Sequence, residues 1–226
     1  MDPRQPTLYY NRDRVEVVRA VPHSVHVVVD VGCANGLLGA RLKAERPGIE
    51  VRGIEVDPDA ASRARQVLDD AIHGRAEDTL PVHWPRPDCV IFADVLEHLV
   101  DPWAVVATWH KRLVKRGTLV TTIPNVLHRS VVRGLLGGRW DYANEGVLDR
   151  THLRFFTRET ALALVEGGGF RVRSVRRLMD LSELPKIARS LINAWARGEE
   201  RRPASGLRRK LLDLYTVQFL ITAESA

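Results

Sequence analysis

The sequence lacks the features that mark secreted, disulfide-linked and membrane-spanning proteins. Cys33 and Cys89 are the only cysteines among 226 residues, which excludes a disulfide framework and a cysteine-based zinc site. No apolar run reaches the roughly 18–20 residues of a membrane span. The opening stretch, MDPRQPTLYYNRDR, has polar and acidic residues where a secretory signal needs an apolar segment. These absences predict a cytoplasmic protein without a membrane span.

Lysine is also scarce: 5 of the 34 basic residues are lysine and 29 are arginine, and the formal net charge is +6. The planar guanidinium group suits phosphate and carboxylate, so an acidic substrate or a nucleic acid is admissible. A GC-rich genome, which favours arginine codons, explains the same bias equally well. The charge therefore bears on partners and not on the fold.

From residue 25 onward, strand-like and helix-like segments alternate. Strands are expected at 26–31, 50–56, 88–94 and 117–124, and helices at 36–45, 57–72 and 102–114. Such alternation indicates a mostly parallel sheet with helices on both faces. A chain of 226 residues is long enough for one well-buried domain and short for two, so we expect a single domain over 1–226.

The last third of the chain changes character. Residues 126–137 predict a short helix and 157–170 a helix capped by Thr157. Residues 170–178 and 214–223 alternate as strands and can pair in antiparallel fashion. Between them, 182–213 predict one or two amphipathic helices around an arginine-rich link. We interpret this segment as a helical insertion between the last two strands, which closes the pocket or contacts a second copy in a homodimer.

A glycine-containing loop, DVGCANG (30–36), follows the first strand. Gly32 and Gly36 let the backbone approach a ligand closely, and the helix that follows presents free N–H groups. The second strand ends in Glu55, nineteen residues past Gly36, where a carboxylate can accept both hydroxyls of a ribose. A loop followed by an acid at the next strand end predicts a nucleoside-containing cofactor at the carboxyl ends of the strands.

The spacing D-x-G-x-x-x-G, with an acid before the first glycine, resembles motif I of class I S-adenosylmethionine-dependent methyltransferases. VVVDVGCANG is similar to that motif, GIEVD to the segment with the ribose acid, and PDCVIFADVLEHL to the motif of the fourth strand. The resemblance covers nearly the whole chain, and the terminal strand pair resembles the family's reversed hairpin. It implies a Rossmann-like, seven-stranded α/β sheet, mostly parallel with a reversed last strand, and S-adenosyl-L-methionine as cofactor.

The resemblance also implies which residues bind the cofactor: Asp30, Gly32, Cys33, Ala34, Gly36, Glu55, Val56, Ala76, Glu77 and Ala93. The chain departs from the family after the third strand, where members carry Gly-Asp and this sequence has Gly74-Arg75. An arginine cannot accept a hydrogen bond from the adenine amino group. Glu77 or Asp78 is therefore expected to do so.

Three polar residues gather in FADVLEHLVDPW (92–103), after a buried strand. If the segment starts a helix, Asp94, Glu97 and His98 share one face at spacings of i, i+3 and i+4. Many methyltransferases carry this pattern without a metal, and there the acid and the histidine order the start of the helix.

A second segment, LDRTHLRFFTRE (148–159), places His152 ahead of the next helix. Its pattern H-x-x-x-x-T-R-E resembles small-RNA 2′-O-methyltransferases, and ubiquinone-pathway O-methyltransferases are similar at the Glu-His step. The first resemblance implies a Mg²⁺ or Mn²⁺ ion held by Asp94, Glu97, His98 and His152. Asp94 departs from those relatives, which carry glutamate at this position.

These residues can act in catalysis with a metal or without one. A hydroxyl with a pKa of about 15 is a poor nucleophile, and a divalent cation lowers its affinity for the proton. Without a metal, His98 or His152 is an ordinary general base, since an imidazole titrates near neutral pH. The sequence leaves these two alternatives open.

The acceptor pocket is expected beside the fifth strand. Candidate acceptor contacts are His128, Trp140, Tyr142 and Arg154, although the aromatic residues can equally cover the loop's own core. Residues 1–24 are interpreted as a lid, with Tyr9, Tyr10 and Arg14 over the cofactor. The stretch from Ile123 to Thr157 resembles bacterial methyltransferases of glycan assembly, which suggests a sugar hydroxyl.

Together these features predict O-methylation of a hydroxyl on a sugar or small natural product, with or without a metal. The first alternative is a metal-free O- or N-methyltransferase of a small molecule. A nucleic-acid binder that uses the arginine-rich residues 197–210, or an enzyme that methylates RNA 2′-hydroxyls, is less favoured.

Overall fold

The computed structural model describes residues 14–182, 184, 186–201 and 206–226, so Tyr9 and Tyr10 of the expected lid lie outside the described residues. Its strands are β1 (Val27–Val31), β2 (Glu50–Glu55), β3 (Asp70–His73), β4 (Cys89–Ala93), β5 (Thr118–Pro124), β6 (Phe170–Met179) and β7 (Thr216–Ser225). They form one sheet in the order β3-β2-β1-β4-β5-β7-β6. All neighbours run parallel except β7, which is antiparallel to both β5 and β6. The predicted sheet with its reversed last strand is confirmed.

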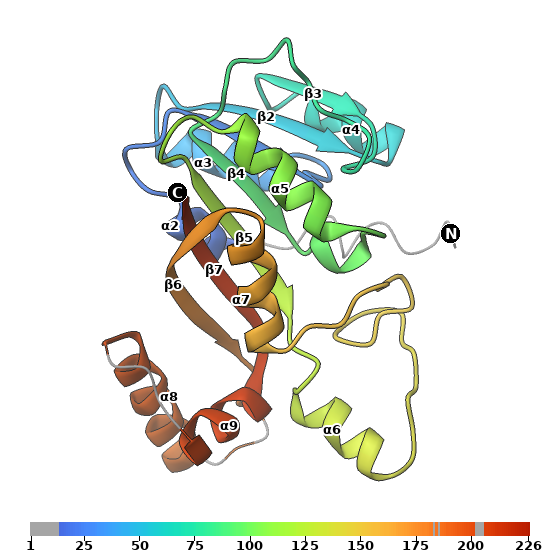
Figure 1. Ribbon diagram of the computed structural model, residues 1–226, viewed down its shortest axis with the longest axis vertical. Helices are drawn as coiled ribbons and strands as arrows, with labels where there is room; N and C mark the ends of the chain where they lie inside the picture. The colour runs from blue at the N-terminus through green and yellow to red at the C-terminus, as the bar shows by residue number, and fades with distance from the viewer. Residues whose placement is uncertain (1–13, 183, 185, 202–205) are drawn as a thin grey trace.

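Helices cover both faces of this sheet (Figure 1). They are α2 (Val15–Ala20), α3 (Leu37–Glu45), α4 (Pro58–Ala64), the 3₁₀ turn η1 (Leu96–His98), α5 (Pro102–Arg112), α6 (Arg129–Leu136), α7 (Arg158–Gly167), α8 (Lys186–Arg201) and α9 (Gly206–Tyr215). None of the helices within the described residues is long and apolar enough to cross a membrane.

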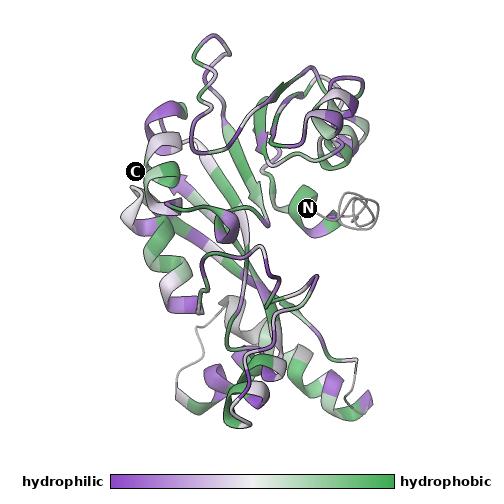
Figure 2. Cartoon of the chain, turned by 90° about the vertical axis from the view of Figure 1, so that its right-hand side faces the viewer, coloured by the Kyte–Doolittle hydropathy of each residue, from purple (hydrophilic) through white to green (hydrophobic). Residues whose placement is uncertain are grey.

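Each face of the sheet carries its own apolar core. On one face α5 and α7 pack against the strands around the fully buried Trp109. On the other face α2, α3 and α4 pack around Leu42. Neighbouring residues of β1 alternate between the two cores, with Val29 in the first and Val28 in the second. Because the central strands β1 and β4 are buried on both sides, their sequences are nearly continuous apolar runs. Apolar strands of the sheet appear as green arrows in Figure 2.

The helix predicted over 57–72 is wrong in its second half. Asp57 caps the helix as expected, since its Oδ1 accepts a hydrogen bond from the Ala60 N–H, but α4 ends at Ala64. Residues 70–73 instead form β3 and pair in parallel with 52–55 of β2. Ala71 is fully buried in this pairing. Pairing with the sheet edge therefore overrides a local pattern that suited a helix equally well.

The helix expected to begin at Asp94 is also wrong. Asp94 has φ of 58°, in the left-handed region, so the chain turns sharply as β4 ends. Only Leu96–His98 then form a single 3₁₀ turn. Asp94 lies before this turn and does not share a helical face with Glu97 and His98.

The helical insertion lies between β6 and β7, as expected. α8 and α9 lie with α6 at one end of the molecule, beyond the β6–β7 pair (Figure 1). A buried ion pair between Arg177 of β6 and Asp213 of α9 ties the insertion to the sheet. Thr157 caps α7 as predicted, with Thr160 as its partner in the capping box.

Asn125 joins the end of β5 to the start of β7. Its side chain is fully buried, and its Nδ2 donates to the carbonyl oxygens of Asp213 and Thr216 at 2.8 and 2.9 Å. Its Oδ1 accepts from the Leu127 N–H at 3.1 Å. One amide side chain thus satisfies three backbone groups and fixes the start of the loop that continues toward His152.

Asn125→Leu should lower the free energy of unfolding by about 3 kcal/mol, because each buried polar group left without a partner costs about 1–3 kcal/mol. Urea denaturation followed by circular dichroism measures this. Thr121→Val, at a buried position of β5 just before Asn125, is the matched control and should cost about 1 kcal/mol or less. Equal stability of Asn125→Leu and the wild type would contradict the anchoring role.

Candidate functional site

The glycine-containing turn joins β1 to α3 at the carboxyl end of the sheet. Gly32, Ala34 and Gly36 all have positive φ, of 76°, 51° and 79°. The Gly32 N–H donates to the Ile54 carbonyl at 2.7 Å, which holds the turn against β2. A Cβ on Gly32 would lie 2.4 Å from Cγ2 of Val95. The turn therefore needs glycine at this position both for its backbone conformation and for space.

Glu55 ties the turn to the end of β2. Its Oε2 accepts from the Ala34 N–H at 2.8 Å and its Oε1 from the Asp57 N–H at 3.0 Å. Burial raises the pKa of this carboxyl, and the two backbone donors partly oppose that rise. The carboxylate is thereby fixed at the strand end where the sequence predicts a ribose acid, and each oxygen keeps acceptor capacity.

Asp30 is buried in β1 directly before the turn. Its Oδ1 has no hydrogen-bond partner in the described parts of the chain. Burial raises the pKa of its carboxyl to about 7, opposed by the positive charge of Arg14 and reinforced by the negative charge of Glu55. A carboxyl this poorly satisfied suits a ligand that supplies donors or positive charge.

Asp94 lies apart from the histidines and has its own partners. Its Oδ2 accepts from Arg14 at 2.7 Å, and its Oδ1 accepts from Oγ1 of Thr122 at 2.6 Å and from Nε2 of Gln218 at 2.7 Å. Its own N–H donates to Thr122 Oγ1. Asp94 thus links Arg14 to β5 and β7, and the predicted lid over the cofactor stays a prediction.

The other predicted cofactor residues are divided between buried and open positions. Cys33 and Ala93 are buried at the ends of the central strands. Val56 is exposed, and Ala76 packs against the core. Glu77 accepts from the Val100 N–H at 3.4 Å and from Arg75 at 3.3 Å. Glu77, one of the two residues predicted to accept from the adenine amino group, therefore lies between Arg75 and the loop after η1.

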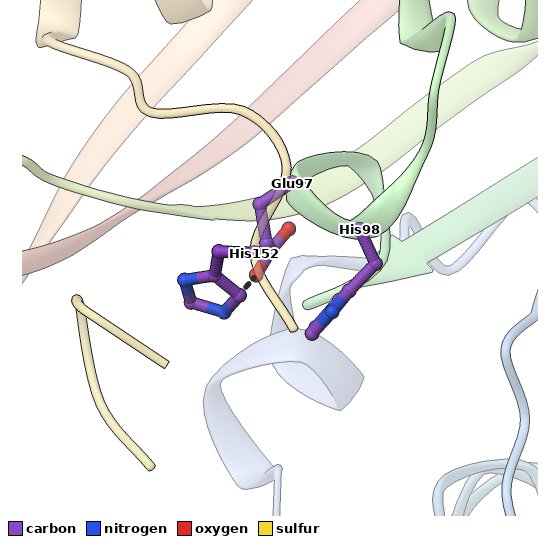
Figure 3. A group of neighbouring side chains, drawn as sticks. All are labelled: Glu97, His98 and His152. Atoms are coloured by element: carbon purple, nitrogen blue, oxygen red, sulfur yellow. Dashed lines mark ion pairs between the residues drawn. The ribbon is translucent and has the colours of Figure 1, made fainter. Parts of the chain in front are cut away.

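Glu97, His98 and His152 form the second half of the site (Figure 3). One potential ligand atom from each lies within 4.8 Å of the others, and among the described residues this is the metal-capable group identified, without Asp94. Nε2 of His152 is 3.9 Å from Oε1 of Glu97. The imidazole rings of His98 and His152 pack edge to face, with 4.7 Å between their centroids. The structure thus brings together three of the four predicted ligands.

The carboxylate of Glu97 is almost fully buried, and neither oxygen has a hydrogen-bond partner among the residues that the structure describes. Burial and the nearby charge of Asp94 raise its pKa well above the ordinary value. Burial and the neighbouring His152 lower the pKa of His98. Both pKa shifts mean that the charged forms of Glu97 and His98 are disfavoured by their buried surroundings.

Both imidazoles are held through their Nδ1 atoms. Nδ1 of His152 is 3.0 Å from the Val147 carbonyl oxygen, and Nδ1 of His98 is 3.2 Å from the Thr151 carbonyl oxygen. A carbonyl only accepts, so each Nδ1 carries the proton and each Nε2 keeps its lone pair. This is the arrangement in which histidine binds a metal.

The residues present fit a divalent cation. Among the described residues, both oxygens of Glu97 and Nε2 of His98 have no hydrogen-bond partner. Burying such groups is unfavourable unless a ligand or ion interacts with them. Two imidazoles and one carboxylate make a set rich in nitrogen. Without Asp94 that set favours Mn²⁺ over Mg²⁺, which prefers oxygen ligands.

The predicted acceptor contacts lie in the loop between β5 and α7. Trp140 contacts Phe155 edge to face at 5.1 Å, and Tyr142 is exposed. His128 is buried and caps α6. Arg154 donates to the Val100 carbonyl and lies over the ring of Trp103 at 5.9 Å. In this structure the Arg154 guanidinium is therefore engaged with the protein's own loop.

Sequence reasoning missed the residues that support the site. Thr122 and Gln218 hold Asp94, although they follow it by 28 and 124 positions. Thr151 and Asp149 lie beside His98. The pair Asp149–Thr151 was visible next to His152 in LDRTH, and its turn-forming residue types were the one available signal.

Asp30 should make the protein less stable as the pH rises. Its folded pKa of about 7 lies above the ordinary 3.8, so its stabilising contribution is complete below about pH 4 and is lost on passing pH 7. Asp30→Asn should therefore gain stability relative to the wild type between pH 5 and pH 8, measured by urea denaturation. The exposed Asp59→Asn is the control and should show no such gain. A pH-independent difference for Asp30→Asn would contradict this.

Comparison with known proteins identifies the family of the chain. Residues 5–175 match a family model described as a methyltransferase domain. The chain is 30% identical over 212 residues to a ubiquinone biosynthesis O-methyltransferase of Xylella fastidiosa, covering 82% of this chain and 82% of that protein. A protein of the same description from Cereibacter sphaeroides is 28% identical over 118 residues, covering 50% of this chain and 47% of that protein.

Solved structures share the fold. A SAM-dependent methyltransferase of Thermotoga maritima, described as a possible histamine N-methyltransferase, matches with a TM-score of 0.63 and 19% identity over 94% of this chain and 87% of that chain. One from Archaeoglobus fulgidus matches with a TM-score of 0.60 and 19% identity over 93% and 92%. Because the family model spans most of the chain and the fold agrees, the chain belongs to the methyltransferase family and is an S-adenosylmethionine-dependent methyltransferase.

Proposed function

We propose that this methyltransferase acts on a hydroxyl of a small-molecule acceptor, on a sugar or a small natural product, beside a divalent cation held by Glu97, His98 and His152. The observation that carries the proposal is the buried Glu97 carboxylate, which has no hydrogen-bond partner among the described residues and lies beside two histidines whose Nδ1 atoms each face a backbone carbonyl. The relative from Xylella fastidiosa, described as an O-methyltransferase, supports oxygen as the atom methylated.

At the cofactor end, S-adenosylmethionine supplies an electrophilic methyl group on its sulfonium. The turn through Gly32 and Gly36 leaves room for the cofactor against the backbone. Glu55 is held by two backbone N–H groups and accepts from the ribose hydroxyls. Asp30, at the carboxyl end of β1, has a pKa raised to about 7, so a positively charged sulfonium beside it would favour its ionised form, and the neutral product would not.

At the acceptor end, a bound cation supplies Lewis acidity, which lowers the pKa of a hydroxyl. Glu97, His98 and His152 hold that charge in a buried position. Mn²⁺ is the preferred ion, because the two imidazoles are softer ligands than Mg²⁺ usually takes. The buried surroundings exclude water, which would compete for the methyl group.

A metal-free reaction is the alternative, with oxygen or nitrogen as the atom methylated. It is favoured by one observation: Nε2 of His98 carries a lone pair, has no partner and belongs to an imidazole whose pKa is lowered. Such a group can take the proton of an acceptor directly. In this alternative, activity is insensitive to chelators and depends on His98 more than on Glu97.

Gly32→Ala should abolish binding of S-adenosylmethionine, because the new Cβ would lie 2.4 Å from Val95. Isothermal titration calorimetry measures the affinity. Gly48→Ala is the matched control, since Gly48 also has positive φ but no atom within 4 Å of its Cβ position. Adding Val95→Ala to Gly32→Ala should restore part of the affinity. Unchanged binding by Gly32→Ala would remove the turn from the cofactor site.

Glu97→Gln should lower Mn²⁺-dependent methyl transfer at least about tenfold while leaving stability equal or higher, since it removes a buried charge. The assay uses S-adenosylmethionine with methyl glycosides, catechol, histamine and a short RNA, and mass spectrometry locates the methyl group. Glu166→Gln, at an exposed position of α7, is the control.

Methylation of an oxygen that chelation abolishes and Mn²⁺ restores supports the proposal. Methylation of histamine, or chelator-resistant activity that Glu97→Gln leaves intact, would support the metal-free alternative. A product on the RNA alone would replace the small-molecule acceptor with a nucleic acid.

A further inference from the structure

Both histidines of the site are positioned by one loop, which we call the histidine loop (residues 143–154). The loop is closed by the Ala143–Asp149 bridge, in which the Arg150 N–H donates to the Ala143 carbonyl at 3.0 Å. It is pinned to η1 because the N–H groups of Leu153 and Arg154 both donate to the Glu97 carbonyl, at 2.8 and 3.0 Å. The histidine loop is therefore hydrogen-bonded directly to the backbone of Glu97.

Thr151 lies in this loop with its hydroxyl beside His98. Its Oγ1 is 3.1 Å from Nδ1 of His98 and 2.7 Å from Oδ1 of Asp149. A threonine hydroxyl has one proton, and a carboxylate oxygen can only accept. The proton therefore goes to Asp149, and Oγ1 must accept from His98.

Asp149 shapes this part of the loop. Its buried carboxylate accepts twice on Oδ1, from the Thr151 N–H at 2.8 Å and from the Thr151 hydroxyl. The two bonds orient both the hydroxyl and the backbone of Thr151. As a result the carbonyl oxygen and Oγ1 of Thr151 both face Nδ1 of His98, and both act as acceptors.

We propose that Asp149 is a positioning residue which, through Thr151, keeps the proton of His98 on Nδ1 and so presents Nε2 unprotonated beside Glu97. Asp149 does not itself reach the group of three residues. The consequence for cation binding rests on the proposed function, whereas the protonation state of His98 does not. Partners of this kind typically change metal affinity by about 10–100-fold when removed.

The proposal distinguishes the two histidines. Nδ1 of His152 is held by the Val147 carbonyl, a backbone group that no side-chain substitution removes. Nδ1 of His98 also faces a backbone carbonyl, that of Thr151, but it has a second acceptor in the Thr151 hydroxyl, which a substitution can remove or reorient. Substitutions at Asp149 or Thr151 should therefore shift the proton of His98 and leave that of His152 in place.

The test is ¹⁵N NMR of histidine-labelled, metal-free protein, which reads which ring nitrogen is protonated, combined with Mn²⁺ titration. The wild type should show His98 protonated on Nδ1. Asp149→Ala and Thr151→Val should both increase the Nε2-protonated population of His98 and weaken Mn²⁺ binding about tenfold or more. Asp149→Asn and Thr151→Ser, which keep the acceptor and the hydroxyl, should stay near the wild type.

Thr151→Val is decisive if Asp149→Ala fails to fold, because Thr151 is exposed and valine has the same shape. Protonation of His98 on Nε2 in the wild type would overturn the proposal. So would a folded Thr151→Val protein with an unchanged His98 signal. A wild type that binds no Mn²⁺ but shows the expected NMR response would defeat the proposed cation site and still support the positioning role.

Discussion

The candidate site centres on one unfavourable arrangement: the Glu97 carboxylate is buried, and within the described part of the chain it has no hydrogen-bond partner. The same residue's backbone carbonyl accepts two N–H groups from the loop that carries His152, which holds the histidine next to the carboxylate. A buried carboxylate with raised pKa lowers stability at neutral pH. Such a group next to two imidazoles held through their Nδ1 atoms is the arrangement that supports the proposed cation.

The proposed cofactor site differs, because most of its carboxylates accept hydrogen bonds from the protein. Glu55 accepts from two backbone N–H groups, and Asp94 accepts from Arg14, Thr122 and Gln218. Asp30 is the exception, with one oxygen unpartnered. Rigid, satisfied carboxylates suit a cofactor that must bind in one orientation. In the proposed reaction, the methyl group passes from a cofactor held by these ordered residues to an acceptor beside Glu97, His98 and His152. Among the described residues, the Glu97 carboxylate has no partner until a ligand or ion binds.

Local sequence predicted the parallel strands, the glycine turn and the segments that hold Glu97 and His152, since each has a residue pattern within about ten positions. It failed where contacts between distant segments decide the outcome. Residues 70–73 became β3 because the edge of β2 was free to pair. Asp94 left the metal-capable group because Thr122 and Gln218, on β5 and β7, hold it elsewhere. No spacing near Asp94 contains that information.

The most direct test of a cation at Glu97, His98 and His152 is pulsed electron paramagnetic resonance of the wild-type protein with one equivalent of Mn²⁺. Electron spin echo modulation detects nitrogen nuclei bound to the ion. The account predicts coupling to two imidazole nitrogens, one of which disappears in His152→Ala. Bound Mn²⁺ without nitrogen coupling, or a spectrum that His152→Ala leaves unchanged, would contradict it.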